Sequence, residues 1–172
     1  NSHDAARRAA TKGIIEYQPL PAQLDPLAAV AAGELHVPPM RLRQGDAQKK
    51  LKAATHHIKG EFSAGGQEQF YLEGHISYVI PGENNSIHAY CSTQHPSEMQ
   101  QLVSHTLDID ASRVTVEIRR MGGGFGGKES QSAGFVCIAA VCANSLQRPV
   151  KMRLDRDDDF LITGKRHPFN YQ

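Results

Sequence analysis

Residues 121–128 (MGGGFGGK) have the composition that points most directly to chemistry. Five glycines in six positions carry a large cost in backbone entropy. The segment lies between a predicted strand and a predicted helix, where successive backbone N–H groups and the helix dipole can bind an anion. The alternative is a tight strand-to-helix turn that binds nothing. The glycine density favours a ligand-binding loop.

The loop matches the dinucleotide fingerprint G-x-G-x-x-G through Gly122, Gly124 and Gly127. Asp155 follows the next predicted strand, where an acidic residue could bind a ribose. This pattern keeps a nicotinamide-dinucleotide-binding dehydrogenase open as an alternative. The fingerprint strand usually opens its domain, whereas about a hundred residues of other elements precede it here.

A phosphate-binding P-loop is a second possibility for the same residues. Gly122, Gly127 and Lys128 fit G-x-x-x-x-G-K, but Glu129 stands where that motif has Ser or Thr. The hydroxyl that would bind Mg²⁺ is replaced by a carboxylate, which repels triphosphate oxygens. The sequence therefore argues against a P-loop.

A second glycine pair occurs at residues 65–68 (GGQE). Paired glycines next to a strand-like run indicate close backbone approach to another group. The amide of Gln67 could both donate and accept hydrogen bonds there. The equally acceptable alternative is a β-bulge with a surface amide.

Composition excludes several classes of protein. The 172 residues contain 19 Lys and Arg and 18 Asp and Glu, for a formal net charge of +1. That balance argues against a nucleic-acid partner and against a polybasic membrane anchor. A hydrophobic share of 40% with 22% charged residues is typical of a folded protein. No apolar run is long enough for a membrane span, and three cysteines fit a reducing cytoplasm.

The elements that must position these residues follow from local patterns. Alternating or β-branched runs predict strands at 56–62, 70–80, 86–92, 114–118 and 150–154. The second and third form a hairpin around the turn at 81–85. A capping box at Ser97 predicts a helix before the fourth strand, and residues 130–146 predict a buried helix. The resulting order, a β-hairpin region followed by β-α-β-loop-α-β, predicts an α+β fold with a mixed sheet and helices packed on it.

The first 45 residues are less regular. A short strand is predicted at 14–17. Outside this region, residues 155–159 near the other end of the chain predict a polar turn. Residues 25–33 predict a short helix, with Asp25 as N-cap, Pro26 at its first position and Gly33 after its end. Prolines, basic residues and glycine then give a linker.

Three segments together resemble one known family. Residues 65–73 (GGQEQFYLE), 121–129 (MGGGFGGKE) and 156–169 (RDDDFLITGKRHPF) occur in this order, and at these spacings, in the molybdenum-cofactor subunit of the xanthine dehydrogenase family. The resemblance implies that residues 1–45 are the end of a preceding small domain plus a linker. It implies that residues 46–172 are the first part of a molybdopterin-binding domain, and that the chain is a fragment of a longer polypeptide.

The resemblance also implies an activity. Members of that family are molybdenum hydroxylases, which hydroxylate a purine such as hypoxanthine or xanthine with oxygen derived from water. Electrons leave through iron–sulfur clusters and FAD to NAD, on other segments or subunits. The implied partners are a purine substrate, the remainder of the molybdenum subunit and the iron–sulfur and flavin parts.

Site residues follow from the resemblance, position by position. Gln67 is expected to hydrogen-bond the oxo ligand of molybdenum, and Phe125 to offer its backbone amide at the metal. Gly123 and Gly124 are expected to let the pterin lie against the main chain. Glu129 is expected to bind the purine, since aldehyde oxidases usually have an apolar residue there. The family's general base lies beyond the last residue, so the 172-residue chain alone is expected to be inactive.

Overall fold

The computed structural model describes residues 2–172, and the chain divides into two compact units after His57. The first unit contains three short helices without buried residues, α1 (His3–Ala10), α2 (Pro26–Ala32) and α3 (Ala47–Ala53). Helix α2 confirms the predicted caps, because the side chain of Asp25 accepts from an amide in the first turn and Gly33 ends the helix. The strand predicted at 14–17 is wrong, since those residues are exposed and make no sheet.

The second unit is built on a four-stranded mixed sheet with the order β4-β3-β2-β5. Strand β2 (Ile76–Pro81) pairs antiparallel with β3 (Ile87–Cys91) and with β5 (Val150–Arg153). Strand β4 (Val114–Glu117) pairs parallel with β3. Single turns of 3-10 helix, η1 (Glu83–Asn85) and η2 (Ala111–Arg113), precede β3 and β4. The predicted hairpin, the mixed sheet and the α+β class are confirmed.

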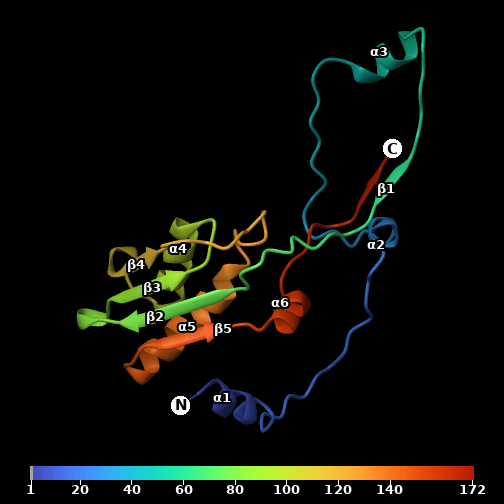
Figure 1. Ribbon diagram of the computed structural model, residues 1–172. Coiled ribbons are helices and arrows are strands. Elements are labelled where there is room, and N and C mark those ends of the chain that lie inside the picture. Colours follow the sequence, from blue (N-terminus) through green and yellow to red (C-terminus); the bar gives the residue numbers. More distant parts are fainter. Residues whose placement is uncertain (1) are drawn as a thin grey trace. The chain divides into compact units, whose positions relative to one another are not determined.

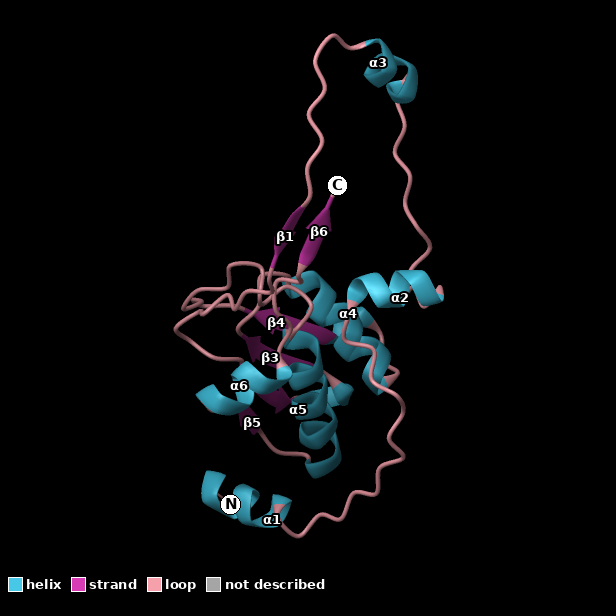
Figure 2. Ribbon diagram, turned by 90° about the vertical axis from the view of Figure 1, so that its right-hand side faces the viewer, coloured by secondary structure: helices cyan, strands magenta, loops and turns pink. Residues whose placement is uncertain are grey.

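Helices α4 (Pro96–Leu107) and α5 (Ser132–Leu146) cover one face of this sheet (Figures 1 and 2). Their contact with the strands forms the core, in which fully buried Val79 and Ala89 of the sheet meet Met99, Val103 and Val136 of the helices. The parallel β3–β4 pair needs a crossover connection, and α4 supplies it. The glycine-rich loop follows β4 and leads into α5, so this core fixes both of its flanks.

The predicted strands at 56–62 and 70–80 are wrong in their extent. Strand β1 covers only Phe62–Ala64 and pairs with a strand that the patterns missed, β6 (Phe169–Tyr171). Strand β2 begins at Ile76, because side chains from residues 156–159 form hydrogen bonds with the backbone groups just before it. Arg156 donates to the carbonyls at 71 and 72, and Asp159 accepts from the amide at 75.

Three helix predictions also need correction. Helix α4 begins one residue before Ser97, with His95 as N-cap and no side-chain cap. Helix α5 is not buried on all sides, since Ile138 on its outer face is 52% exposed. The predicted polar turn at 155–159 is instead the start of α6 (Arg156–Ile162), with Asp155 as N-cap. An N-cap carboxylate and acidic residues in the first turn both favour a helix there. Within residues 2–172, no helix combines the length and apolar character needed to cross a bilayer.

Candidate cofactor site

The glycine-rich loop is packed too tightly for side chains at several positions. A Cβ atom at Gly122 would lie 2.6 Å from Cβ of Glu73, and one at Gly127 would lie 2.6 Å from Cε1 of Tyr71. The same Gly127 position lies 3.2 Å from Cδ of Gln69. Alternate residues of segment 69–73 therefore face the loop, and the glycines permit this close approach.

The other two segments singled out in the sequence join the loop here. Gln67 lies two residues before segment 69–73, and its backbone forms two hydrogen bonds with Arg166, of 3.0 Å and 2.9 Å. The ion pair between Glu68 and Lys165, at 2.7 Å, lies beside this bridge. Segments 65–73, 121–129 and 156–169, far apart in sequence, thus form one assembly.

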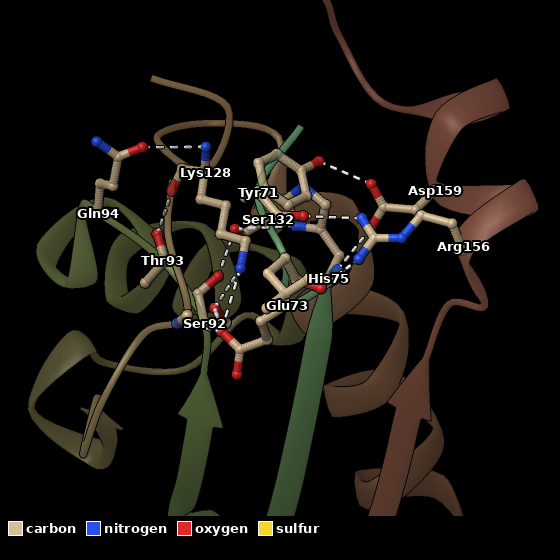
Figure 3. Close-up of polar contacts among 12 residues, drawn as sticks. Tyr71, Glu73, His75, Ser92, Thr93, Gln94, Lys128, Ser132, Arg156 and Asp159 are labelled. Atoms are coloured by element: carbon tan, nitrogen blue, oxygen red, sulfur yellow. Dashed lines mark hydrogen bonds and ion pairs between the residues drawn. The ribbon is translucent and has the colours of Figure 1, made fainter. Parts of the chain in front are cut away.

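One carboxylate oxygen binds both ends of the loop (Figure 3). Oε2 of Glu73 accepts from the amide of Gly122 at 2.9 Å, from Oγ of Ser92 at 2.7 Å and from Nζ of Lys128 at 3.1 Å. The Lys128 side chain is 0% exposed, and its Nζ also lies 2.9 Å from Oγ of Ser92. We call Glu73, Ser92 and Lys128 the Glu73 cluster. Burial raises the pKa of Glu73, but the hydrogen bonds from Gly122, Ser92 and Lys128 outweigh burial and lower it.

A second set of contacts holds the latter half of the loop. Oε1 of Gln94 accepts from the amides of Gly126 and Lys128, at 3.0 Å and 3.2 Å. The carbonyl of Lys128 accepts from the amide of Gln94 at 2.7 Å and from Oγ1 of Thr93 at 2.9 Å. The amide of Gly127 donates to the carbonyl of Gly124 at 2.7 Å. All three amides at 126–128, and the carbonyl of Lys128, are therefore held by hydrogen bonds within the protein.

The loop apex, residues 123–125, differs from the loop ends in its hydrogen bonding. In the part of the chain that the structure describes, the amides of Gly123, Gly124 and Phe125 donate to no protein acceptor. Phe125 has a positive φ of 53°, a conformation uncommon outside glycine, and its side chain is 74% exposed. Three consecutive amides without a protein acceptor are donors available to an anion or to ring acceptors. They belong to the residues predicted to contact the cofactor and metal.

A buried network behind the loop holds segment 69–73 in place (Figure 3). The hydroxyl of Tyr71 donates to Oδ1 of Asp159 at 2.7 Å, and the amide of His75 donates to Oδ2 at 2.6 Å. Arg156 donates to the carbonyl of Tyr71 at 2.8 Å. Burial raises the pKa of Tyr71 to about 12, and the hydrogen bond to Asp159 and its charge act in the same direction, against the opposing hydrogen bond with Thr163. Burial lowers the pKa of His75, so the imidazole is neutral near pH 7.

Sequence reasoning assigned no role to Glu73, Ser92, Gln94 or Asp159, and spacing alone gives no signal for them. Each acts through a partner distant in sequence. Asp155, considered as a ribose ligand, accepts from the amide of Asp158 as the N-cap of α6. A dinucleotide fold places its fingerprint in a parallel sheet. Strand β4, which precedes the loop, does pair parallel with β3, but β2 runs antiparallel to both of its neighbours, so the sheet as a whole is mixed. The geometry therefore gives no support to the dehydrogenase alternative.

The remaining predicted residue, Glu129, follows Lys128 at the end of the loop. Its side chain is exposed, and its carbonyl accepts from Oγ1 of Thr93 at 3.3 Å. The glycine loop thus presents the free amides at its apex and a carboxylate at its end.

Comparison with known proteins decides the family. The family model described as "Molybdopterin cofactor-binding domain" matches residues 30–172. The chain belongs to the molybdopterin cofactor-binding domain family. The sequence is 43% identical to xanthine dehydrogenase 2 of Arabidopsis thaliana over 98% of this chain and 13% of that protein. It is 40% identical to xanthine dehydrogenase of Calliphora vicina over 96% of this chain and 12% of that protein.

This molybdopterin cofactor-binding domain also has solved structural relatives. Aldehyde oxidoreductase from Desulfovibrio gigas aligns with 97% of this chain and 19% of its own length, with a TM-score of 0.79 and 21% identity. The enzyme of the same name from Desulfovibrio desulfuricans aligns with a TM-score of 0.80 and 16% identity, over 98% of this chain and 20% of its own. At these identities the likeness establishes the fold. The chain spans about an eighth of the length of the curated relatives quoted above.

Proposed function

We propose that this chain forms part of the cofactor and substrate pocket of a molybdenum hydroxylase that acts on purines such as hypoxanthine and xanthine. The observation that carries the proposal is the loop apex, where three consecutive amides without protein acceptors lie in a domain of the molybdopterin-binding family. In this proposal residues 46–172 are the first part of the cofactor-binding domain, and residues 1–45 are the end of a preceding domain plus a linker.

The residues present fit a molybdopterin. Its phosphate and pterin oxygens need donors, and the amides of Gly123 and Gly124 supply them. A Cβ atom at Gly126 would meet nothing within 4 Å, so the main chain is accessible beside the apex. Uncharged backbone donors hold a polar cofactor without adding a titratable group to the pocket.

When bound, the molybdenum cofactor supplies the redox chemistry that transfers oxygen from water to a purine carbon. Gly123 and Gly124 hold the pterin against the main chain, and the amide of Phe125 hydrogen-bonds a ligand of the metal. Gln67 does the same through its side-chain amide, which can donate and accept.

Glu129 binds the purine in this proposal. A carboxylate beside a heterocyclic N–H accepts a hydrogen bond and fixes the orientation of the ring. An apolar side chain at this position could not do so, and this difference favours a purine over an aldehyde substrate. The general base, the iron–sulfur clusters and the FAD that passes electrons to NAD lie outside the 172 residues.

The test uses the full-length protein purified with its cofactor. We expect molybdenum and pterin in a constant ratio to polypeptide, and hydroxylation of hypoxanthine and xanthine with ¹⁸O incorporated from labelled water. Glu129→Ala is expected to raise KM for the purine about tenfold to a hundredfold, because one charge-assisted hydrogen bond is lost. Glu117→Gln, which alters an exposed ion pair with Arg119, is the matched control. A protein that carries molybdenum and pterin but does not hydroxylate purines would refute the proposal.

A further inference from the structure

We propose that Glu73 and Lys128 are positioning residues, whose ion pair fixes the amide of Phe125 and the carboxylate of Glu129 relative to each other. The inference rests on the proposed function, because it concerns the same loop. It adds residues that touch neither cofactor nor substrate, and that act only through the loop.

The geometry shows how one carboxylate can set the shape of the loop. Gly122 begins the loop and Lys128 ends it, and both donate to the same oxygen, Oε2 of Glu73, at 2.9 Å and 3.1 Å. The amide of Glu73 also donates to the carbonyl of Gly122 at 3.2 Å. The span between the loop ends is therefore set by Glu73, and the apex at Phe125 lies between these two fixed points.

Lys128 transmits this constraint to Glu129. Its side chain points inward, where Nζ lies 4.7 Å from the ring centre of Tyr71. Its carbonyl is held by Thr93 and Gln94. With both the side chain and the carbonyl fixed, the direction in which the chain enters Glu129 is fixed as well. Loss of the ammonium removes the side-chain half of this restraint and leaves only the main-chain contacts with Thr93 and Gln94 to orient Glu129.

The two halves of the ion pair are unequally buried, and this makes a sharp prediction. The Lys128 side chain is 0% exposed, whereas that of Glu73 is 36% exposed. Glu73→Gln leaves a fully buried ammonium without its counter-charge, which is the costly way to break such a pair. Lys128→Met leaves a carboxylate that reaches water and keeps its donors Gly122 and Ser92. Glu73→Gln should therefore be the more damaging change, and the double variant should recover part of the loss.

The experiment compares full-length holoenzymes that carry Lys128→Met, Glu73→Gln or both, with Glu117→Gln as control. Molybdenum and pterin per polypeptide, purine kcat and KM, and hydrogen exchange of peptides spanning 121–131 are measured for each. We expect faster loop exchange and a rise in KM of about tenfold or more, since small misplacements of binding groups have large kinetic effects. The double variant is expected to have a lower KM than Glu73→Gln alone. Faster exchange confined to residues 121–131 distinguishes this from a merely destabilised domain, in which exchange would rise throughout the second unit.

The outcomes separate this inference from the proposed function. Unchanged KM and unchanged loop exchange in variants that retain molybdenum and pterin would overturn the positioning role. If Glu73→Gln fails to fold, Lys128→Met and the double variant decide by the same criteria. If the wild-type protein does not hydroxylate purines, the proposed function fails, and the role of Glu73 and Lys128 toward Glu129 fails with it. In that case neither the wild-type protein nor any variant hydroxylates purines. If the positioning role alone fails, the wild-type protein and the variants all hydroxylate purines with the same KM.

Discussion

Replacement of Asp159 with alanine is expected to destabilise the second unit strongly. Asp159 is fully buried and accepts from the hydroxyl of Tyr71 and the amide of His75. Both donors are themselves 1% exposed, so water cannot replace the lost acceptor. An unsatisfied buried donor costs about 1–3 kcal/mol, and two such donors cost about 2–6 kcal/mol. Domains are stabilised by only about 5–15 kcal/mol, so this is a large share.

Urea unfolding of the 172-residue chain, followed by circular dichroism, measures this loss. With a slope of about 2 kcal/mol per molar, the midpoint should fall by about 1–3 M. Asp159→Asn retains one acceptor oxygen and is expected to lose about half as much. Asp157→Ala, at an exposed position in the same helix, is the control. A loss below about 1 kcal/mol for Asp159→Ala would show that the two donors find other partners, and would refute the reasoning.

Two further predictions concern the loop and the buried histidine. Gly127→Ala is expected to cost about 1–3 kcal/mol and to change the near-ultraviolet circular dichroism of Tyr71, because the added methyl meets the buried ring. Gly126→Ala is the comparison, because a Cβ atom there has open space but the backbone has a φ of +83°. It should cost about 1–2 kcal/mol of stability and leave the spectrum of Tyr71 unchanged. If the two variants give the same spectrum, the packing argument for Gly127 is contradicted. The lowered pKa of His75 means that the unfolded chain binds more protons below pH 6.5. The free energy of unfolding should therefore fall as pH drops below 6.5. His75→Gln should make the free energy of unfolding less dependent on pH, as measured by urea unfolding at pH 7.5 and 5.5. An equal change between the two pH values in both proteins would count against this prediction.

The parts of the fold with strong local signals could be predicted from sequence. The hairpin at 76–91 alternates buried and less buried side chains, and α2 has a carboxylate cap and a C-terminal glycine. Residues 70–75 have equally strong strand propensity, yet they form no strand. Their backbone groups bind Arg156 and Asp159, and such tertiary contacts override local preference.

The candidate site likewise contains residues that the sequence could predict and residues that it could not. The glycine loop is visible in the sequence because its composition is unusual. Glu73 and Asp159 are ordinary acidic residues in sequence, and their importance comes from partners 55 and 88 positions away. No spacing rule reports which distant residue a carboxylate meets once the chain is folded. The roles assigned to Gln67, Gly123, Gly124, Phe125 and Glu129 stay predictions for the experiments above.

The pairing of β1 with β6 bears on how the domain is made. Phe62 lies opposite Tyr171, so the first strand of the second unit is completed only by its last. During synthesis the whole sheet and both covering helices emerge before the partner of β1 exists. Until then, β1 presents unpaired backbone groups to neighbouring nascent chains, which is a recognised route to aggregation. The risk of such association should therefore depend on how long β1 waits for β6 during synthesis.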